Sequence, residues 1–325
     1  MTVFVLRRLL QTALVLFITS LLVFFGLYVI GNPVDILVNP VADEVERARA
    51  AAALGLDKPI VEQYWVFLKG AVTGELGTSF VFGRPAMEVI LERMPATMEL
   101  AFLAMVIAVA LGVPLGLYAG LKPDSWLSKT IMAGSILGFS LPTFWVGLLL
   151  ILVFAVQLGW LPSTGRGPTA EFLGIKLSIL HWEGLKYALL PAVNLALFKL
   201  SLIIRLTRAQ VREQSLLDYI KFARAKGLSR RRVIGVHLLK NILIPLVTVI
   251  GLELGSVIAF AVVTETIFAW PGMGKLVIDS IFQLDRPVVV AYLLVVVFMF
   301  IVINLVVDLL YSFLDPRVRL ADVKS

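Results

Sequence analysis

The sequence predicts an all-α, polytopic membrane protein with six transmembrane helices. Of its 325 residues, 59% are hydrophobic and only 16% are charged, whereas a typical soluble domain has about half apolar and about a quarter charged residues. A chain this apolar cannot hide its side chains in one water-soluble core. The apolar stretches are long and show no two-residue alternation of the kind found in transmembrane β-barrels, so we expect helical spans.

Six apolar runs are long enough to cross a bilayer, whose core of about 30 Å requires about 20 helical residues. They are Leu9–Ile30, Leu100–Leu121, Ile131–Leu158, Tyr187–Ile204, Ile242–Val263 and Val288–Tyr311. The first run is too long for the apolar region of a signal peptide, and no small-residue cleavage pattern follows it. We therefore interpret it as a retained first helix of a single transmembrane domain, residues 1–325.

The positive charges indicate the orientation of these helices. Ten Lys and Arg residues lie between Arg205 and Lys240, and further basic residues precede the first span and follow the last. Cytoplasmic loops carry such an excess of Lys and Arg. We predict that both termini and residues 205–240 are cytoplasmic, which leaves residues 31–97 outside.

The extracytoplasmic segment 31–97 is predicted to hold two short helices. One runs near Asp43–Leu54 and stops at Gly55, a residue suited to a left-handed C-cap. The next has Pro59 in its first turn and Asp57 as a potential cap. The segment is interpreted either as a lid on the helix ends or as a docking surface for an external protein.

The connection Thr264–Pro287 contains Trp270-Pro-Gly-Met-Gly, which cannot continue a helix. A short amphipathic stretch, Leu276–Phe282, follows it. The aromatic residues here, Trp270 included, suit an interfacial belt. A partly re-entrant loop that lines protein or water is the alternative interpretation.

Catalytic and metal-binding patterns are missing from the sequence. The chain has no cysteine, and its two histidines, His181 and His237, fall on opposite sides of the predicted membrane. No carboxylate cluster has metal-ligand spacing, and no complete phosphate-binding loop is present. We predict that the chain is not an enzyme and binds no metal or cofactor itself.

Four ionisable residues fall at or inside the spans: Glu99, Lys199, Glu253 and Asp308. Each should face the bundle interior or water, because a charge in lipid is costly. Glu99 is interpreted as structural, at a helix start. Asp308 is expected to pair with a neighbour. Lys199 and Glu253 either pair with each other or line a polar translocation path.

The segment Asp218–Asn241 carries an unusual combination of residues. Small residues at Ala223, Ala225 and Gly227 are predicted to form a patch that a partner backbone can approach, with basic residues around it. A basic helix lying on anionic lipid is the alternative interpretation. A small patch, a basic rim and a short helix favour insertion into a groove of another protein.

The sequence motif Tyr219-x-x-x-Ala-Arg-Ala-Lys-Gly-Leu228 resembles the cytoplasmic coupling loop of binding-protein-dependent ABC permeases of the dipeptide, oligopeptide and nickel branch. The resemblance runs nearly end to end and is strongest to the first of the two dipeptide permease subunits. It includes Leu54-Gly-Leu-Asp-Lys-Pro59, Gly74-Glu-Leu-Gly-Thr-Ser79, Thr264-Glu-Thr-Ile-Phe268, Trp270-Pro-Gly-Met-Gly274 and Asp315-Pro-Arg317.

The resemblance implies a type I ABC importer permease fold in the bacterial inner membrane. It implies a second homologous permease subunit, two ATPase subunits that bind ATP and Mg²⁺, and an extracytoplasmic solute-binding protein as partners, and no nucleic acid. The coupling residues carried over are Ala223, Arg224, Ala225, Lys226, Gly227, Leu228, Ser229 and Arg230.

Two other classes are weighed against this interpretation. A secondary, ion-coupled transporter would show internal repeats, and no convincing repeat is visible. A membrane scaffold without transport would not need the coupling segment. The solute stays open among a dipeptide, an oligopeptide, a nickel chelate, an opine, glutathione and a sugar.

Overall fold

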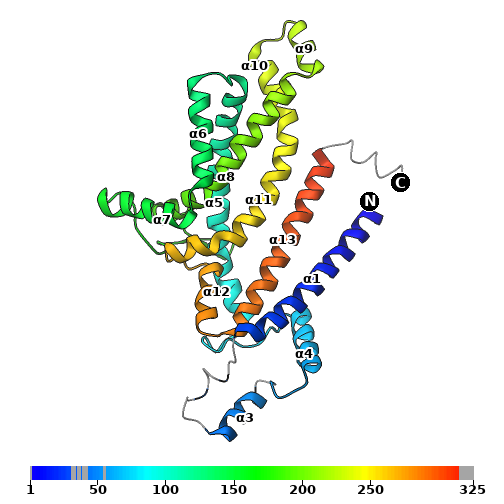
Figure 1. Cartoon of the computed structure of the whole chain (residues 1–325), viewed down its shortest axis with the longest axis vertical. Coiled ribbons are helices and arrows are strands. Elements are labelled where there is room, and N and C mark those ends of the chain that lie inside the picture. The colour runs from blue at the N-terminus through cyan, green and yellow to red at the C-terminus, as the bar shows by residue number, and fades with distance from the viewer. Residues whose placement is uncertain (1, 31–33, 35–37, 39–42, 54–55, 315–325) are drawn as a thin grey trace. The chain divides into compact units, whose positions relative to one another are not determined.

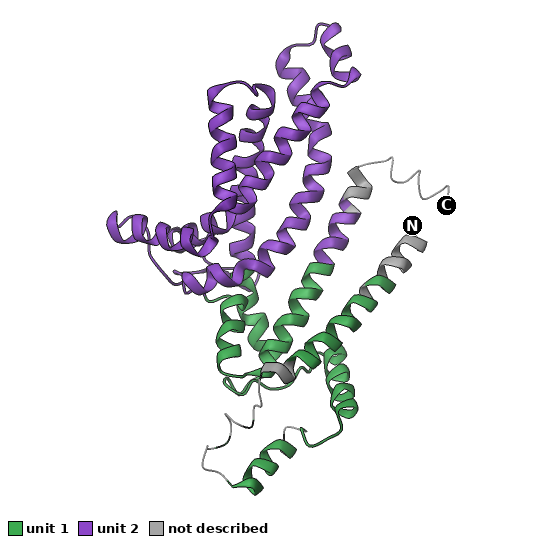
Figure 2. Cartoon of the chain, in the orientation of Figure 1, with its two compact units in different colours: residues 1–97, 271–301 green, residues 98–270, 302–325 purple. Residues whose placement is uncertain are grey.

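The computed structural model describes residues 2–30, 34, 38, 43–53 and 56–314, and these are almost entirely helical (Figure 1). The chain divides into two compact units (Figure 2), residues 1–97 with 271–301 and residues 98–270 with 302–325. The first unit contains α1 (Thr2–Ile30), α3 (Glu44–Ala53), α4 (Ile60–Thr73) and α12 (Met273–Phe282).

The second unit contains the residues that the sequence analysis assigned to coupling and to the path. Its elements are α6 (Trp126–Ser140), α7 (Thr143–Leu150), the π-helix η1 (Ile151–Gln157), α8 (Trp182–Ser215), α9 (Asp218–Ala225), α10 (Arg230–Arg232), the π-helix η2 (Val233–Leu238) and α11 (Leu239–Ile267). Two long helices, α5 (Ala86–Leu121) and α13 (Arg286–Leu314), contribute residues to both units. A small antiparallel hairpin, β1 (Ala170–Phe172) with β2 (Ile175–Leu177), was not predicted.

Four helices in the described part of the chain are long and apolar enough to cross a membrane: Ala86–Leu121, Trp182–Ser215, Arg230–Ile267 and Arg286–Asp308. The first three contain the second, fourth and fifth predicted spans, and Arg286–Asp308 covers all but the last three residues of the sixth. Within α1, the apolar helical stretch described is Ala13–Gly26, which is shorter than a full span. The predicted helical membrane fold is confirmed, and the count of six spans stays a prediction.

The third predicted span, Ile131–Leu158, is not one continuous helix. Its two halves, α6 and α7 with η1, meet at an angle of 106°. Pro142 stands at the break, and Leu141 before it is extended, with φ −79° and ψ 136°. The proline ring excludes the helical conformation from the preceding residue. A proline within a long apolar run is a local signal for a kink, and the structure has a full break at Pro142.

Glycines bring α5 close to α8. A Cβ atom added at any of three α5 glycines would lie within 3 Å of an α8 side chain; the pairs are Gly112 with Ile203, Gly116 with Thr207 and Gly120 with Val211. The four-residue spacing on both helices keeps these contacts on one face.

The helices of segment 31–97 differ in detail from the prediction. Asp43 caps α3, because its Oδ1 accepts a hydrogen bond from the backbone N–H of Glu46 at 2.8 Å. The predicted stop at Gly55 lies outside the described residues. The prediction that Asp57 caps the next helix was wrong. The N-cap of α4 is Pro59, and no side chain makes a capping hydrogen bond there. A proline fixes the backbone at this position, so no carboxylate is needed.

The second helix of this segment, α4, packs against α1. The rings of Tyr64 and Phe67 lie 5.3 and 5.6 Å, centroid to centroid, from that of Phe24. The helix ends at Gly74, whose φ of 81° is left-handed.

The predicted amphipathic stretch Leu276–Phe282 is confirmed within α12. The placement of Trp270 in an interfacial belt stays a prediction. This side chain is fully buried, and the Arg166 guanidinium lies 5.7 Å from the centre of its ring. The indole is enclosed because the loop bends back on α11, with the backbone N–H of Trp270 donating to the carbonyl of Glu265 at 2.8 Å.

Candidate functional site: a helical projection and an intramembrane ion pair

The segment between α8 and α11 forms a helical projection. After α8 ends at Ser215, the short helix α9 runs from Asp218 to Ala225, and a turn over residues 226–229 leads into α10. From Arg230 the helix continues through η2 into α11 without a break as far as Ile267. The projection is therefore continuous with a helix that is long and apolar enough to cross a membrane.

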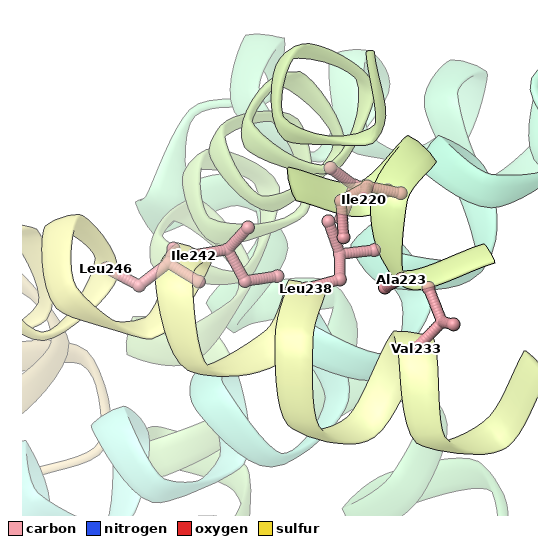
Figure 3. Packing of buried hydrophobic residues seen from close by; sticks show 7 residues of the cluster. Ile220, Ala223, Val233, Leu238, Ile242 and Leu246 are labelled. Carbon is pink, nitrogen blue, oxygen red and sulfur yellow. The ribbon is translucent and has the colours of Figure 1, made fainter. Parts of the chain in front are cut away.

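Apolar side chains hold the projection on the rest of its unit (Figure 3). Ile220 and Ala223 of α9 are buried against Val233, Leu238 and Ile242, which follow the turn. The cluster extends to Val211 of α8 and Leu246 of α11. Within each helix its members recur three to five residues apart, and the five-residue step from Val233 to Leu238 spans the π-helix η2. One face of each helix is therefore buried.

The turn after α9 has the hydrogen bonds of a Schellman motif. The N–H of Leu228 donates to the carbonyl of Ala223 at 3.4 Å, and the N–H of Gly227 donates to the carbonyl of Arg224 at 2.9 Å. Leu228 packs on the cluster that contains Ala223, the apolar contact typical of this motif. The φ of Gly227 is 72°, and an added Cβ would meet open space. Glycine is required here for its backbone conformation.

The exposed surface of the projection differs from the predicted patch in one residue. Ala223 is only 4% exposed and lies in the protein's own core, so its place in the patch was wrong. The residue points inward because it shares the buried face of α9 with Ile220. The exposed coupling candidates are Arg224, Ala225, Lys226, Gly227, Ser229 and Arg230, and Leu228 is half-buried.

Positive charge on this surface is not neutralised within the described residues. The ion pair found on α9 joins Lys221 to Asp218 at 2.9 Å, and none of the described ion pairs includes Arg224 or Arg230. Lys226 lies over the ring of Phe222, 4.5 Å from its centre, and Phe222 is itself 62% exposed. The projection thus presents cations beside an exposed aromatic ring.

Lys199 of α8 and Glu253 of α11 form an ion pair. The Lys199 ammonium donates to Glu253 Oε2 and, at 2.6 Å, to Ser256 Oγ. The side chain of Lys199 is 9% exposed and that of Glu253 is 23% exposed. The structure therefore confirms pairing, one of the two interpretations that the sequence left open. Ser256 was missed, although its position one turn after Glu253 on the same helix was a usable signal.

Glu99 is structural, as predicted, but for a different reason. It lies inside α5, which begins at Ala86, so no helix start is near it. Its buried carboxylate accepts hydrogen bonds from Arg166 Nη2, Ser178 Oγ and the backbone N–H of Ile179, each at 2.5 Å. The helix α5 begins well before the apolar run that predicted it. Polar residues near a helix end lower the local hydropathy but do not end the helix.

In the part of the chain that the structure describes, no three His, Asp or Glu side chains are grouped closely enough to hold a metal ion.

Comparison with known proteins identifies the family. Residues 112–320 match the model described as "Binding-protein-dependent transport system inner membrane component", and residues 1–101 match its N-terminal companion. The chain belongs to this family. The predicted resemblance is confirmed.

Relatives match over almost the whole chain. The chain is 39% identical to the dipeptide transport system permease protein DppB of Escherichia coli K12, over 97% of this chain and 98% of the relative. It is 37% identical to DppB of Alkalihalophilus pseudofirmus, covering 98% and 100%. It is also 40% identical to the di/tripeptide permease protein DppB of Pseudomonas aeruginosa, covering 89% and 90%.

Among solved structures, a chain of the MetNI methionine ABC transporter in an inward-facing conformation is similar in fold. The TM-score is 0.54 at 16% identity, over 71% of this chain and 98% of that one. This likeness confirms the predicted permease fold.

Proposed function

We propose that this chain is one of two permease subunits of an ATP-driven importer of di- and oligopeptides, and that the projection at residues 218–241 docks on an ATPase subunit. The peptide class is supported by the relatives, which are named as dipeptide permeases and match nearly full length. The family description supports an external binding protein as a partner.

The observation that carries the docking assignment is the construction of the projection. Its inner face is fixed by an apolar cluster, while its outer face carries unneutralised cations, an exposed aromatic ring and a glycine turn. A surface that is anchored on an apolar cluster and leaves cations and an aromatic ring exposed is suited to a protein partner, because exposed aromatic and Arg side chains supply much of the binding energy at such interfaces.

The same construction suggests how motion is passed on. A cavity of about 470 Å³ lies behind the projection, lined by Gly120, Ser215, Arg224, Arg230 and neighbouring apolar residues. Free space behind α9 lets it shift when the ATPase subunits close. Because α10, η2 and α11 are one helix, the shift reaches the membrane at Glu253. The ATPases bind ATP and Mg²⁺, and this chain supplies half of the path.

Gly227→Arg tests the assignment. The left-handed backbone conformation at position 227 disfavours residues other than Gly and Asn. An Arg side chain also adds bulk on the docking face. We expect the variant to insert and to retain its sister permease, but to retain about tenfold less ATPase subunit, since it disturbs the centre of an interface. The measurement is the yield of each subunit after purification in mild detergent, together with ATP-dependent dipeptide uptake in vesicles.

Gly235→Ala is the matched control, because Gly235 lies in helical η2 and an added Cβ there meets open space. It should behave as the parent protein. Normal ATPase retention and uptake by Gly227→Arg would remove the coupling assignment. Uptake by the parent permease without ATPase subunits would favour a secondary transporter.

A further inference from the structure

The Lys199–Glu253 pair occupies an unusual place in the membrane. Glu253 lies 14 residues from the end of α11 at Ile267, about 21 Å at the helical rise, and Lys199 faces it from α8. Replacing a buried ion pair by apolar residues is often neutral or stabilising, so packing alone does not explain the two charges. Because charges avoid lipid, the exposed part of Glu253 faces water or protein.

The hydrogen bonds of the pair do not use the full capacity of either side chain, and the Lys199 ammonium also lies 5.2 Å from the centre of the Phe198 ring. Lys199 uses two of its three N–H groups, for Glu253 Oε2 and Ser256 Oγ. The hydrogen bonds found for the Glu253 carboxylate in the described chain are all made by Oε2, which leaves Oε1. An incoming carboxylate and an incoming ammonium group can therefore engage Lys199 and Glu253 before the pair itself separates.

We infer that Lys199 and Glu253 form a transit site for the two charged ends of a zwitterionic peptide, an inference that rests on the proposed function. The peptide carboxylate replaces Glu253 beside Lys199, and the peptide ammonium binds Glu253. Ser256 lies 2.8 Å from Glu253 Oε2 and continues to donate to it. When the peptide leaves, the pair closes again, which keeps binding weak enough for release.

Charge matching explains why a pair is needed. A zwitterion has no net charge but two groups that lose water when it enters the membrane, and each needs a partner of opposite sign. A neutral pair supplies both partners without trapping a single ion, whereas a sugar would require neither charge. Apolar surface adjoins the pair: Phe198 stacks on Phe139 at 4.6 Å, and Phe139 is 42% exposed. This surface accepts varied side chains without selecting one.

The first test uses the parent complex of permease and ATPase subunits without the external binding protein, whose own selectivity is thereby removed. Binding of radiolabelled Ala-Phe is compared with that of N-acetyl-Ala-Phe-amide by equilibrium dialysis. We expect the blocked peptide to bind about tenfold more weakly, since it lacks two charge-assisted contacts. Equal binding of the two peptides, or binding of neither at millimolar concentration, would overturn the inference.

The second test is the double substitution Lys199→Met with Glu253→Met, which leaves no unpaired charge. If the pair serves transit, the complex assembles, while affinity for Ala-Phe and ATP-dependent uptake both fall about tenfold. If the double variant assembles and takes up Ala-Phe at the rate of the parent protein, the transit-site inference is overturned and the proposed function stands. Loss of the sister permease from the double variant also overturns the transit-site inference, because the pair is then an assembly contact. Absence of dipeptide uptake by the parent complex with all partners present refutes the proposed function instead.

Discussion

At the scale of single residues, the Glu99 carboxylate shows how this chain tolerates a charge in its core. The side chain is completely buried, but it accepts hydrogen bonds from Arg166, Ser178 and the N–H of Ile179. Arg166 also lies over Trp270. One acidic residue thereby joins α5 to the loop before α8 and to the buried indole.

Glu99→Gln should be among the most damaging single substitutions outside the projection. It keeps the size of the side chain but leaves the Arg166 guanidinium, only 13% exposed, without its counter-charge. Removing one partner of a buried pair costs about 3–5 kcal/mol, so we expect a clear loss of thermal stability of the purified protein in detergent.

The matched control is Glu62→Gln, which breaks the pair with Lys58, where both side chains are about half exposed. Exposed pairs contribute little, and no measurable change is expected. Equal stability of Glu99→Gln and the control would show that the Arg166 contact does not hold the loop.

At the scale of secondary-structure elements, the contact between α5 and α8 depends on glycines that leave room for branched side chains. At Gly116 the backbone of α8 itself is close, because an added Cβ would lie 2.6 Å from Thr207 and 2.7 Å from the carbonyl of Ile204. The backbone carbonyl cannot move aside as a flexible side chain could. The helices would have to separate.

Gly116→Leu should therefore destabilise the protein by about 1–3 kcal/mol, the usual cost of overpacking. Gly134→Leu is the control, because Gly134 lies on α6 with nothing within 4 Å of an added Cβ. The two variants add the same atoms to helices of the same unit. Thermal unfolding in detergent compares them, and equal midpoints would contradict the packing argument.

How far the sequence predicts an element depends on whether its signal is local. Apolar length predicted the spans, and Pro142 is a signal of the same local kind for a change of direction, because both act within a few residues. The size of the bend and the burial of Ala223 could not be predicted, since they depend on neighbours distant in sequence. The pairing of Lys199 with Glu253 was one of two possibilities until α8 and α11 were placed side by side.

At the scale of the whole molecule, the distribution of Lys and Arg predicts that the projection lies in the cytoplasm and segment 31–97 outside. The structure adds where probes can be attached. Arg224 and Glu62 are exposed, and the chain has no cysteine, so a single introduced cysteine reports one position only. Ala223, next to Arg224 but buried, provides a control for accessibility.

We expect Glu62→Cys to react with a membrane-impermeant maleimide in intact spheroplasts, and Arg224→Cys to react only after the membrane is opened. Ala223→Cys should react in neither case until the protein is denatured, because its side chain is enclosed by the cluster around Ile220. The positive-inside rule provides the expected direction. Labelling of Arg224→Cys from outside would invert the topology and place the projection beyond the reach of any cytoplasmic ATPase. Docking, the transmission through α11 and the import direction would then all be excluded together.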